Sequence, residues 1–428
     1  MILIKNAKAL NPGGGWEREA DILIDNGIIA KIAAPGTIEE TKGMTVIEGK
    51  GLAAAPGLMD VHVHFRDPGL TYKEDIHTGA AAAARGGYTA VVCMANTKPP
   101  VDNVETLEYV LEEGKKTGIH VYQAAAVSKG MQGKELTDME ELKACGAVGF
   151  TDDGIPLVNE VLVKKAMEEA ARLQVPLSFH EEYPGFIGSS GVNEGKISAQ
   201  MGLKGASALA EDALVARDCM IALHTGADID IQHISSGSSV KMVKLAKELG
   251  AKVWAEVTPH HFTLTEEAVL KHKTLAKMNP PLRTEKDRQA ILEGLKDGTI
   301  DMIATDHAPH SQEEKEKEFT KAPSGIIGLE TALSLAVTYL VRPGHLTLLQ
   351  LMEKMSLNPA RMYHMDYGYL EEGRPADVVV FAPEEQWVVG NYASKASNSP
   401  FTGETLYGKI KATICQGKVV YEDGICRE

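Results

Sequence analysis

The chain has 428 residues, and its 44 lysines and arginines stand against 59 aspartates and glutamates, which gives a formal net charge of −15. This length suits one large α/β barrel or two to three smaller domains. The negative balance argues against nucleic acid or an anionic membrane as the main partner, although a local cationic group can still hold an anionic substrate inside a cleft.

The location of the protein is indicated by its thiols and its first residues. The five cysteines form no CxxC pair and are odd in number, so reduced thiols are expected. Residues 1–5 are typical of a strand and lack the charged head and apolar core of a signal peptide. No apolar stretch approaches the roughly 18 residues that a membrane span needs. We therefore expect a cytoplasmic globular protein.

The two ends of the chain share a β pattern. Residues 1–52 are typical of short strands around turns at 13–15 and 25–27. Residues 373–428 look similar, with a strand at 376–381 and a second β run bent at 416–417. Two sets of strands that flank a barrel can pair with each other. We therefore predict a small β-sandwich domain formed by both chain ends, residues 1–53 and 367–428.

Between these ends, short β-rich runs alternate with helical patterns. Strands are predicted at 57–64, 88–95, 119–127, 147–152, 175–180, 228–233, 252–257 and 301–305. Helices are predicted at 80–85, 104–116, 139–144, 161–172, 211–224, 240–249, 287–295 and 328–341. Eight such units predict an α/β fold, a (β/α)8 TIM-like barrel over residues 54–366. A doubly wound open sheet is the alternative, but no GxGxxG opens a helix here.

The first predicted strand carries the most informative motif of the chain. An apolar run leads into DVHVHFR at 60–66, where His62 and His64 are spaced i, i+2. On a strand these side chains point the same way. Two imidazoles on one face can clamp a divalent metal, and neutral imidazole suits zinc. Such pairs can also be surface or packed histidines, but matching ligand candidates recur at strand ends downstream.

Further candidates follow from the rule that active residues of such barrels lie at the carboxyl ends of the strands. The residues that meet this rule are His62, His64, Asp152, Asp153, His180, His233 and Asp306. Four histidines and one or two carboxylates exceed the three protein ligands of a single catalytic zinc and suit two metal ions. As alternatives, His180 and His233 could be core histidines and Asp306 could be a helix cap.

Three local questions remain open from the pattern alone. Alternate strand residues face opposite ways, so only one of Asp152 and Asp153 should point into the site. His260 and His261 are adjacent and cannot both chelate from one strand face, so we expect them to support the site or the fold rather than bind metal. The charged run at 311–318 is either a solvated surface segment or a mobile lid over the site.

The chain resembles the class I bacterial dihydroorotases of the amidohydrolase superfamily along almost its whole length. The segments that carry the resemblance are DVHVHFR at 60–66, MANT at 94–97, FTDDG at 150–154, TPHH at 258–261, MNPPLR at 278–283, ATDHAPH at 304–310 and GIIGLET at 325–331. The resemblance implies the dihydroorotase reaction (EC 3.5.2.3), the reversible cyclisation of N-carbamoyl-L-aspartate to L-dihydroorotate in pyrimidine (UMP) biosynthesis.

The resemblance also implies roles for individual residues. It implies two zinc ions per chain, held by His62, His64 and Asp306 and by His180 and His233, with Asp153 bridging both. It implies that Asp306 is the acid/base for a hydroxide that bridges the ions. The substrate contacts that it implies are His64, Arg66, Asn96, Asn279, His310, Ser324 and Gly325.

Two segments depart from the family pattern. HEEY at 180–183 stands where the family often has HCED, and PSG at 323–325 stands where many members have an aromatic residue or Pro-Gly. Neither departure changes a predicted ligand side chain, although Ser324 weakens the case for the contact at that position.

The alternative functions are a dihydropyrimidinase or hydantoinase, an allantoinase, and an inactive barrel that serves as structural partner of a transcarbamoylase. Dihydropyrimidinases, hydantoinases and allantoinases typically carry a carboxylated lysine after the fourth strand, where this chain has FTDD. A scaffold would be expected to lose ligands, and this chain retains them. For the dihydroorotase we expect a small-molecule substrate, a homodimer and an association with an aspartate transcarbamoylase.

Overall fold

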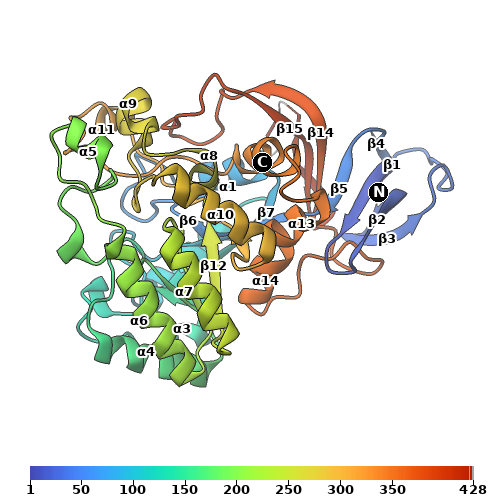
Figure 1. Cartoon of the computed structure of the whole chain (residues 1–428). Helices are drawn as coiled ribbons and strands as arrows, with labels where there is room; N and C mark the ends of the chain where they lie inside the picture. The colour runs from blue at the N-terminus through green and yellow to red at the C-terminus, as the bar shows by residue number, and fades with distance from the viewer. Residues whose placement is uncertain (424, 427–428) are drawn as a thin grey trace.

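Eight parallel strands form the centre of the molecule in the computed structural model, which describes residues 1–423 and 425–426 (Figure 1). In chain order they are β6 (Leu58–Val63), β7 (Tyr88–Cys93), β8 (His120–Ala125), β9 (Gly149–Thr151), β10 (Leu177–Phe179), β11 (Ile229–Ile231), β12 (Val253–Val257) and β13 (Met302–Ile303). Each strand pairs with the next. A parallel bridge between Val63 and His307 returns the chain after β13 to β6. The predicted (β/α)8 barrel is therefore confirmed, with the sheet nearly closed.

Helices follow the strands and cover the outside of the barrel (Figure 1). They are α1 (Ile76–Arg85), α2 (Val104–Gly114), α3 (Met139–Ala144), α4 (Glu160–Leu173), α6 (Leu209–Thr225), α7 (Gly237–Glu248), α10 (Glu285–Asp297) and α12 (Ala332–Ala336). Shorter helices are α5 (Lys196–Gln200), α8 (Pro259–Thr263), α9 (Ala268–His272), α11 (Gln312–Lys315), α13 (Leu348–Met352) and α14 (Asn358–Met362). In the described part of the chain, no helix is both long and apolar enough to cross a bilayer.

Capping residues explain where the helices begin. Helix α1 starts four residues before the predicted position 80, because the Asp75 carboxylate accepts a hydrogen bond from the Thr78 backbone N–H. The Asn159 side chain caps α4 in the same way. A cap of this kind satisfies backbone donors that have no partner inside the helix. Prediction from apolar spacing therefore found the helices but placed the start of α1 too late.

The barrel strands are apolar on both faces. In β7, Val91 and Cys93 pack in the large cluster shared with the outer helices. Ala90 and Val92 belong to a separate cluster, together with Met302 of β13. Because alternate strand residues point to opposite faces, this second cluster fills the inside of the barrel. The barrel is therefore a packed core, and its strands also carry buried polar side chains, Asp230 among them.

Strands from both chain ends form one mixed sheet beside the barrel, in the order β17-β16-β15-β14-β5-β1-β2-β3 with β4 paired to β1. Their bounds are β1 (Ile2–Asn11), β2 (Trp16–Asp25), β3 (Ile28–Ala33), β4 (Thr45–Glu48), β5 (Ala53–Pro56), β14 (Val378–Val388), β15 (Thr405–Cys415), β16 (Lys418–Glu422) and β17 (Ile425–Cys426). The antiparallel pair of β5 and β14 joins the two ends. The predicted pairing of strands from both chain ends beside the barrel is thus confirmed, as one mixed sheet.

Two predicted turns of this sheet have the backbone that tight hairpins require. Asn26 and Gly27 have φ of 49° and 81°, and Gln416 and Gly417 have φ of 50° and 74°. Two successive residues with positive φ match the right-handed twist of the flanking strands. The domain limits after residues 53 and 366 stay a prediction, and residues 424, 427 and 428 of the segment 367–428 lie outside the described part of the chain.

Candidate active site

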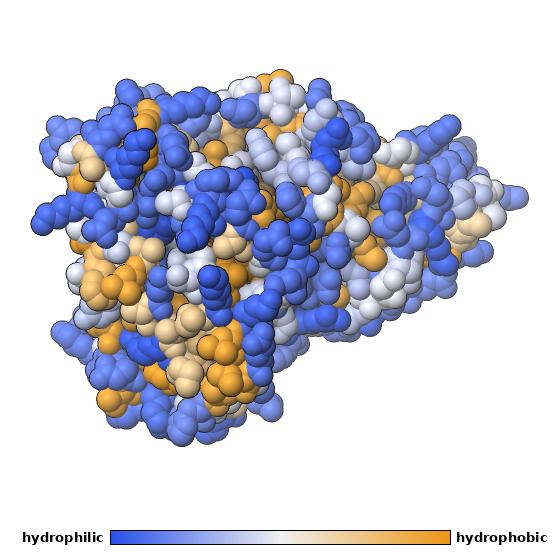
Figure 2. All heavy atoms as spheres, viewed as in Figure 1, coloured by the Kyte–Doolittle hydropathy of each residue, from blue (hydrophilic) through white to orange (hydrophobic). Residues whose placement is uncertain are grey.

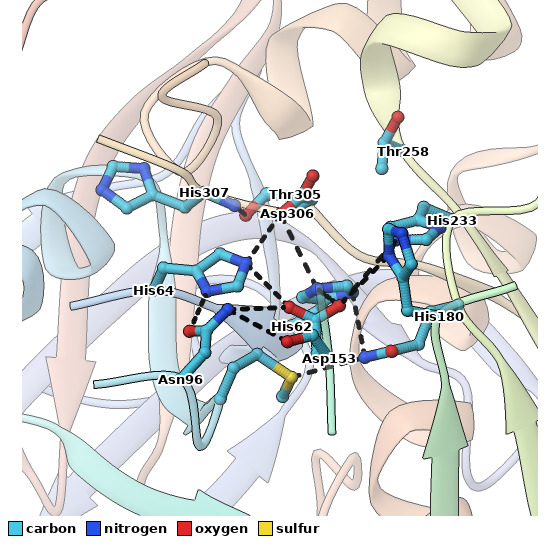
Figure 3. A network of polar contacts seen from close by, with 12 residues as sticks. His62, His64, Asn96, Asp153, His180, His233, Thr258, Thr305, Asp306 and His307 are labelled. Atoms are coloured by element: carbon cyan, nitrogen blue, oxygen red, sulfur yellow. Dashed lines mark hydrogen bonds and ion pairs between the residues drawn. The ribbon is translucent and has the colours of Figure 1, made fainter. Parts of the chain in front are cut away.

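The predicted metal-binding side chains meet at the carboxyl ends of the barrel strands (Figure 3). They lie on or just after five strands: His62 on β6 and His64 just after it, Asp153 after β9, His180 after β10, His233 after β11 and Asp306 after β13. Every one of them is buried or at the limit of burial. The barrel therefore brings together residues that lie up to 244 positions apart in the sequence.

Their donor atoms form two groups of three that share Asp153. His62 Nε2 lies 3.2 Å from Asp153 Oδ1, and His64 Nε2 lies 3.4 Å from Asp153 Oδ2. On the other side, His180 Nδ1 and His233 Nε2 lie 3.7 Å and 3.9 Å from Asp153 Oδ1. Within each group all ligand atoms lie within 4.8 Å of one another. Two adjacent sets of three donors with one shared carboxylate fit a binuclear metal site.

The environment of His62 supports this fit. Its Nε2 atom is buried and makes no hydrogen bond to any described residue, although it faces Asp153. A buried polar atom without a partner is unfavourable, and a cation between the two side chains would satisfy both. Burial alone lowers the pKa of His62, but the carboxylates of Glu256 and Asp153 hold it well above its usual value. A divalent cation bound between these groups would take the place of the positive charge on the His62 ring.

Asp306 lies beside the first group of donors. Its Oδ1 atom is 2.9 Å from His64 Nε2 and 3.6 Å from His62 Nε2. The preceding residue, Thr305, donates its backbone N–H to both carboxylate oxygens of Asp60 at 3.2 Å. This contact ties the segment after β13 to β6. Asp306 is therefore held where its carboxylate faces both the histidines and the open cavity.

A cavity of about 220 Å³ opens in front of these donors. Every residue that the sequence predicted as a substrate contact lines it: His64, Arg66, Asn96, Asn279, His310, Ser324 and Gly325. Asp153, His180, His233 and Asp306 line it as well. One small cavity thus joins the two donor groups to a wall of polar side chains and the Arg66 guanidinium.

Hydrogen bonds orient the residues around this cavity. The Nδ1–H of His64 donates to Asn96 Oδ1 at 2.9 Å, which leaves Nε2 facing Asp153 and Asp306. Asn96 Nδ2 in turn donates to Asp153 Oδ2 at 3.3 Å. Arg66 donates from Nε to the Pro309 carbonyl at 3.3 Å. Asn96, which follows β7, therefore connects two ligand candidates, His64 and Asp153.

Three residues of the site have a left-handed backbone. Arg66, His233 and Asp306 have φ of 61°, 36° and 48°. Such conformations cost residues other than glycine roughly 1–3 kcal/mol each, and they cluster where function requires a particular side-chain direction. All three lie just beyond a barrel strand. The strain is consistent with a site whose geometry the surrounding structure imposes.

The structure decides between Asp152 and Asp153 as the residue that points inward. The carboxylate of Asp152 turns away from the histidines and accepts hydrogen bonds from the backbone N–H of Ser128, at 3.1 Å, and from the Ser128 hydroxyl. Asp153 contacts histidines of both donor groups. The expectation that only one of the two faces the site is met.

His260 and His261 belong to neither donor group. The hydroxyl of Thr258 donates to His261 Nδ1 at 2.7 Å, and His261 Nε2–H donates to the Pro280 carbonyl at 3.0 Å. Thus His261 holds the segment that carries Asn279 at the cavity. This agrees with the expectation that these two histidines support the site or the fold.

Two carboxylates next to the histidines were not predicted from the sequence. Glu256 on β12 accepts from His62 Nδ1 at 2.5 Å and from the backbone N–H of His233 at 3.1 Å. Glu182 accepts from His180 Nε2 at 3.0 Å. Such partners set which ring nitrogen carries the proton and so which nitrogen faces the cation. In the sequence, the available signal for Glu256 was a glutamate inside an otherwise largely apolar predicted strand, 252–257.

Glu256 offers a test of metal binding that does not depend on activity. Because it contacts one residue of each donor group, Glu256→Gln is expected to lower the affinity for zinc by about 10–100-fold. Titration against a chromophoric chelator measures this affinity, and circular dichroism verifies folding. The matched control is Glu293→Gln on the exposed face of α10, where the side chain is 67% exposed. Equal zinc affinity in the Glu256 variant and the unmodified protein would show that this carboxylate does not orient the ligands.

The charged segment at 311–318 packs against the rim of the cavity. It forms the short helix α11, which Ser311 caps. Lys315 is buried, and its ammonium group donates to the carbonyls of Pro323 and Gly325 at 2.9 Å and 3.0 Å. This segment is therefore more than a solvated surface run, and its movement as a lid stays a prediction.

Comparison with known proteins agrees with this geometry. The sequence model of the dihydro-orotase-like family matches residues 51–239. The chain is 59% identical to a dihydroorotase from Clostridioides difficile (strain 630), a match over 98% of this chain and 100% of that protein. It is 53% identical to a dihydroorotase from Clostridium acetobutylicum, over 99% and 100% of the two chains.

A solved structure shows the same fold. The L-hydantoinase (dihydropyrimidinase) from Arthrobacter aurescens superposes with a TM-score of 0.89 at 24% identity, over 100% of this chain and 97% of that one. At this identity the likeness concerns the fold alone. The high identity over full length is with dihydroorotases, and on that basis the chain belongs to the dihydroorotase family of the amidohydrolase superfamily.

Proposed function

We propose that this chain is a zinc-dependent dihydroorotase, which interconverts N-carbamoyl-L-aspartate and L-dihydroorotate in de novo pyrimidine biosynthesis. The observation that carries the proposal is the cavity that joins the two donor groups to the Arg66 guanidinium and to neighbouring polar side chains. Full-length identity to dihydroorotases supports the choice of reaction within the superfamily. The absence of a lysine from FTDD at 150–153 disfavours the hydantoinase and allantoinase alternatives.

The six predicted side chains would hold two zinc ions. His62, His64 and Asp306 would bind one ion, His180 and His233 the other, and Asp153 would bind both. Imidazole nitrogens and carboxylate oxygens are the donors that zinc accepts. When bound, such ions lower the pKa of water to around 7 and polarise a carbonyl oxygen.

Asp306 is the proposed acid/base. In the hydrolytic direction, a water oxygen forms a bond to the ring carbonyl carbon, and the bond from that carbon to the ring nitrogen breaks. The Asp306 carboxylate takes the proton from the attacking water and passes it to the departing nitrogen. Its contact with His64 and its place on the cavity wall support this role. Ring closure uses the same steps in reverse.

The substrate carboxylate is proposed to bind at Arg66. A guanidinium group forms paired, charge-assisted hydrogen bonds with carboxylates, and Arg66 lines the cavity near Asn96. Asn279, His310 and the backbone at 324–325 complete the proposed contacts. Selectivity against rings that lack the carboxylate would then come from these contacts.

We expect the unmodified protein to prefer dihydroorotate strongly over dihydrouracil and hydantoin. Hydrogen bonds to charged groups contribute roughly 1.5–3 kcal/mol each, and a site built for a polar group can reject an analogue lacking it by about 10⁴-fold. Arg66→Met should remove most of this preference and leave the zinc content unchanged. The comparison variant Arg66→Lys keeps the charge but loses the paired geometry, so we expect an intermediate preference. The readout is kcat/KM for dihydroorotate divided by kcat/KM for dihydrouracil and, separately, for hydantoin.

The direct test of function is turnover of dihydroorotate by the metal-replete protein, followed by ultraviolet absorbance, together with metal analysis. About two zinc ions per chain and rapid turnover support the enzyme. Efficient turnover of dihydrouracil by the unmodified protein would instead favour a dihydropyrimidinase. Near-absent metal without turnover would favour the structural partner of a transcarbamoylase.

We further propose a cytoplasmic location, a homodimer and an association with an aspartate transcarbamoylase. The four cysteines whose side chains are described are free thiols, which supports a reducing compartment. Apolar side chains gather on the face over α6 and α7 (Figure 2), where Met220, Leu245 and Leu249 are about half exposed. Sedimentation velocity of the chain alone and mixed with the transcarbamoylase tests both associations.

A further inference from the structure

The loop between β14 and β15, residues 389–404, leaves the small mixed sheet and is bonded to the barrel. The Glu330 carboxylate, which is buried, accepts hydrogen bonds from the backbone N–H groups of Ala393 at 3.0 Å and Ser394 at 3.1 Å. Such contacts hold a loop in place, because a buried acceptor left without a partner is costly. Asn398 lies further along this loop and is also buried. The loop therefore brings a polar side chain of the small sheet into the barrel.

The Asn398 side chain makes three hydrogen bonds to backbone groups of the cavity wall. Its Oδ1 accepts from the backbone N–H of His310 at 3.1 Å, and its Nδ2 donates to the carbonyls of Ala308 and Gly325, each at 3.1 Å. These partners fix the orientation of the amide, because a flip would set donor against donor and acceptor against acceptor. All three partners line the cavity, whereas Asn398 does not. Its influence on substrate must therefore pass through the segments that it holds.

One of these segments carries the carbonyl that holds Arg66. Pro309 lies between Ala308 and His310, the two residues that Asn398 binds, and its carbonyl accepts from Arg66 Nε at 3.3 Å. Arg66 has a φ of 61°, a strained conformation that persists only where surrounding contacts impose it. Because Nε is bonded to Pro309, the two terminal nitrogens of the guanidinium remain to pair with a carboxylate. The position of the Pro309 carbonyl therefore governs how Arg66 meets an anion in the cavity.

We propose that Asn398 is a positioning residue that fixes the Pro309 carbonyl and thereby holds the Arg66 guanidinium for the substrate carboxylate. The inference rests on the proposed dihydroorotase function. It makes the loop between β14 and β15 a determinant of substrate selectivity, although this loop contributes no residue to the lining of the cavity. The competing explanation is a purely structural role, in which Asn398 only stabilises the fold. The two differ in whether a substrate without a carboxylate is affected.

The experiment measures kcat and KM for dihydroorotate and dihydrouracil in the zinc-loaded protein. In Asn398→Ala the Pro309 carbonyl is no longer held, so Arg66 keeps its charge and loses its paired geometry. We expect KM for dihydroorotate to rise by roughly 10–100-fold, which corresponds to the loss of one hydrogen bond to a charged group. Because this contact contributes to ground-state binding, kcat should stay within about threefold. Dihydrouracil has no carboxylate, so its kcat/KM should also stay within about threefold.

Asn398→Asp separates the acceptor of this side chain from its donors. The carboxylate has the same shape as the amide and can still accept from the His310 N–H, but it cannot donate to the carbonyls of Ala308 and Gly325. We expect KM for dihydroorotate to rise at least as much as in Asn398→Ala, because an oxygen would now face these two carbonyls. A KM close to that of the unmodified protein would overturn the proposal.

The neighbouring serine supplies a matched control. Ser399 is buried in the same loop, and its hydroxyl accepts from the Phe401 N–H at 3.2 Å. Ser399→Ala removes a buried hydrogen bond without removing any contact of Asn398 with the barrel. We expect its melting temperature to fall and its kinetic constants for both substrates to match those of the unmodified protein. A rise in KM like that of Asn398→Ala would assign the effect to the loop as a whole and overturn the proposal.

A double-mutant cycle tests whether Asn398 acts through Arg66. In an Arg66→Met background, Asn398→Ala should have almost no further effect on KM for dihydroorotate, because residues that act on one route are not additive. An equal effect in both backgrounds overturns the proposal, as does an equal loss of kcat/KM for dihydroorotate and dihydrouracil in Asn398→Ala.

Folding and function are controlled separately. Circular dichroism and zinc content verify each variant, and Asn398→Ser replaces Asn398→Ala if the latter does not fold. Failure of the unmodified protein to turn over dihydroorotate would contradict the proposed function itself. Turnover by the unmodified protein together with an unchanged KM in the Asn398 variants would contradict only the role of Asn398.

Discussion

Replacing Asp306 with asparagine is expected to lower kcat by at least about 10²–10⁴-fold while most of the zinc is retained. The amide has nearly the same shape as the carboxylate and still offers one oxygen to the site. It cannot accept the proton of the attacking water or deliver it to the leaving nitrogen. The contact of Asp306 with His64, at 2.9 Å, can persist through that oxygen.

Steady-state kinetics with dihydroorotate and metal analysis of the same preparation test this expectation. Asp366→Asn is the control, because that side chain is 74% exposed and lies outside the lining of the cavity. An Asp306→Asn variant within about tenfold of the unmodified protein would exclude Asp306 as the acid/base. Loss of zinc along with activity would mean that the variant reports on metal binding instead.

Asp153→Ala is expected to remove both metal ions together with activity. Asp153 is the one described residue that belongs to both donor groups, so its loss removes the carboxylate that the two ions would share. His180 and His233 would then be left without a carboxylate, and His62 and His64 would keep only the neighbouring Asp306. Two neutral imidazoles are a weak set compared with the three ligands of a catalytic zinc. We expect zinc per chain to fall from about two to well below one after dialysis, as measured by elemental analysis.

The neighbouring aspartate is the matched control. Asp152→Ala removes the partner of Ser128, and the loss of that buried contact is expected to lower the free energy of unfolding by about 1–3 kcal/mol. It leaves both donor groups intact, so two metal ions should remain. The reverse pattern, with metal lost from Asp152→Ala alone, would move the bridging role one residue upstream.

Much of the fold follows from local patterns in the sequence. Runs such as Tyr88–Cys93 are apolar on both faces, which is typical of a strand covered by helices on one side and a core on the other. Eight of these runs, separated by amphipathic helices, allow few architectures other than a barrel. Spacing also marks the site, because histidines at i and i+2 point to the same side of a strand.

The tertiary structure decided the contacts between distant segments. The choice between Asp152 and Asp153 depends on the direction in which the chain turns after β9. The spacing of the residues does not specify that direction. Glu256 meets His62 across 194 residues, and Asn398 meets His310 across 88. These pairs depend on strand register, on the closure of the barrel and on loops that return to its rim. The sequence by itself therefore determined which chemical groups reach one end of the barrel, and only the folded chain determined which of them orient the others, because a hydrogen bond requires an alignment within a few tenths of an ångström that no local pattern specifies.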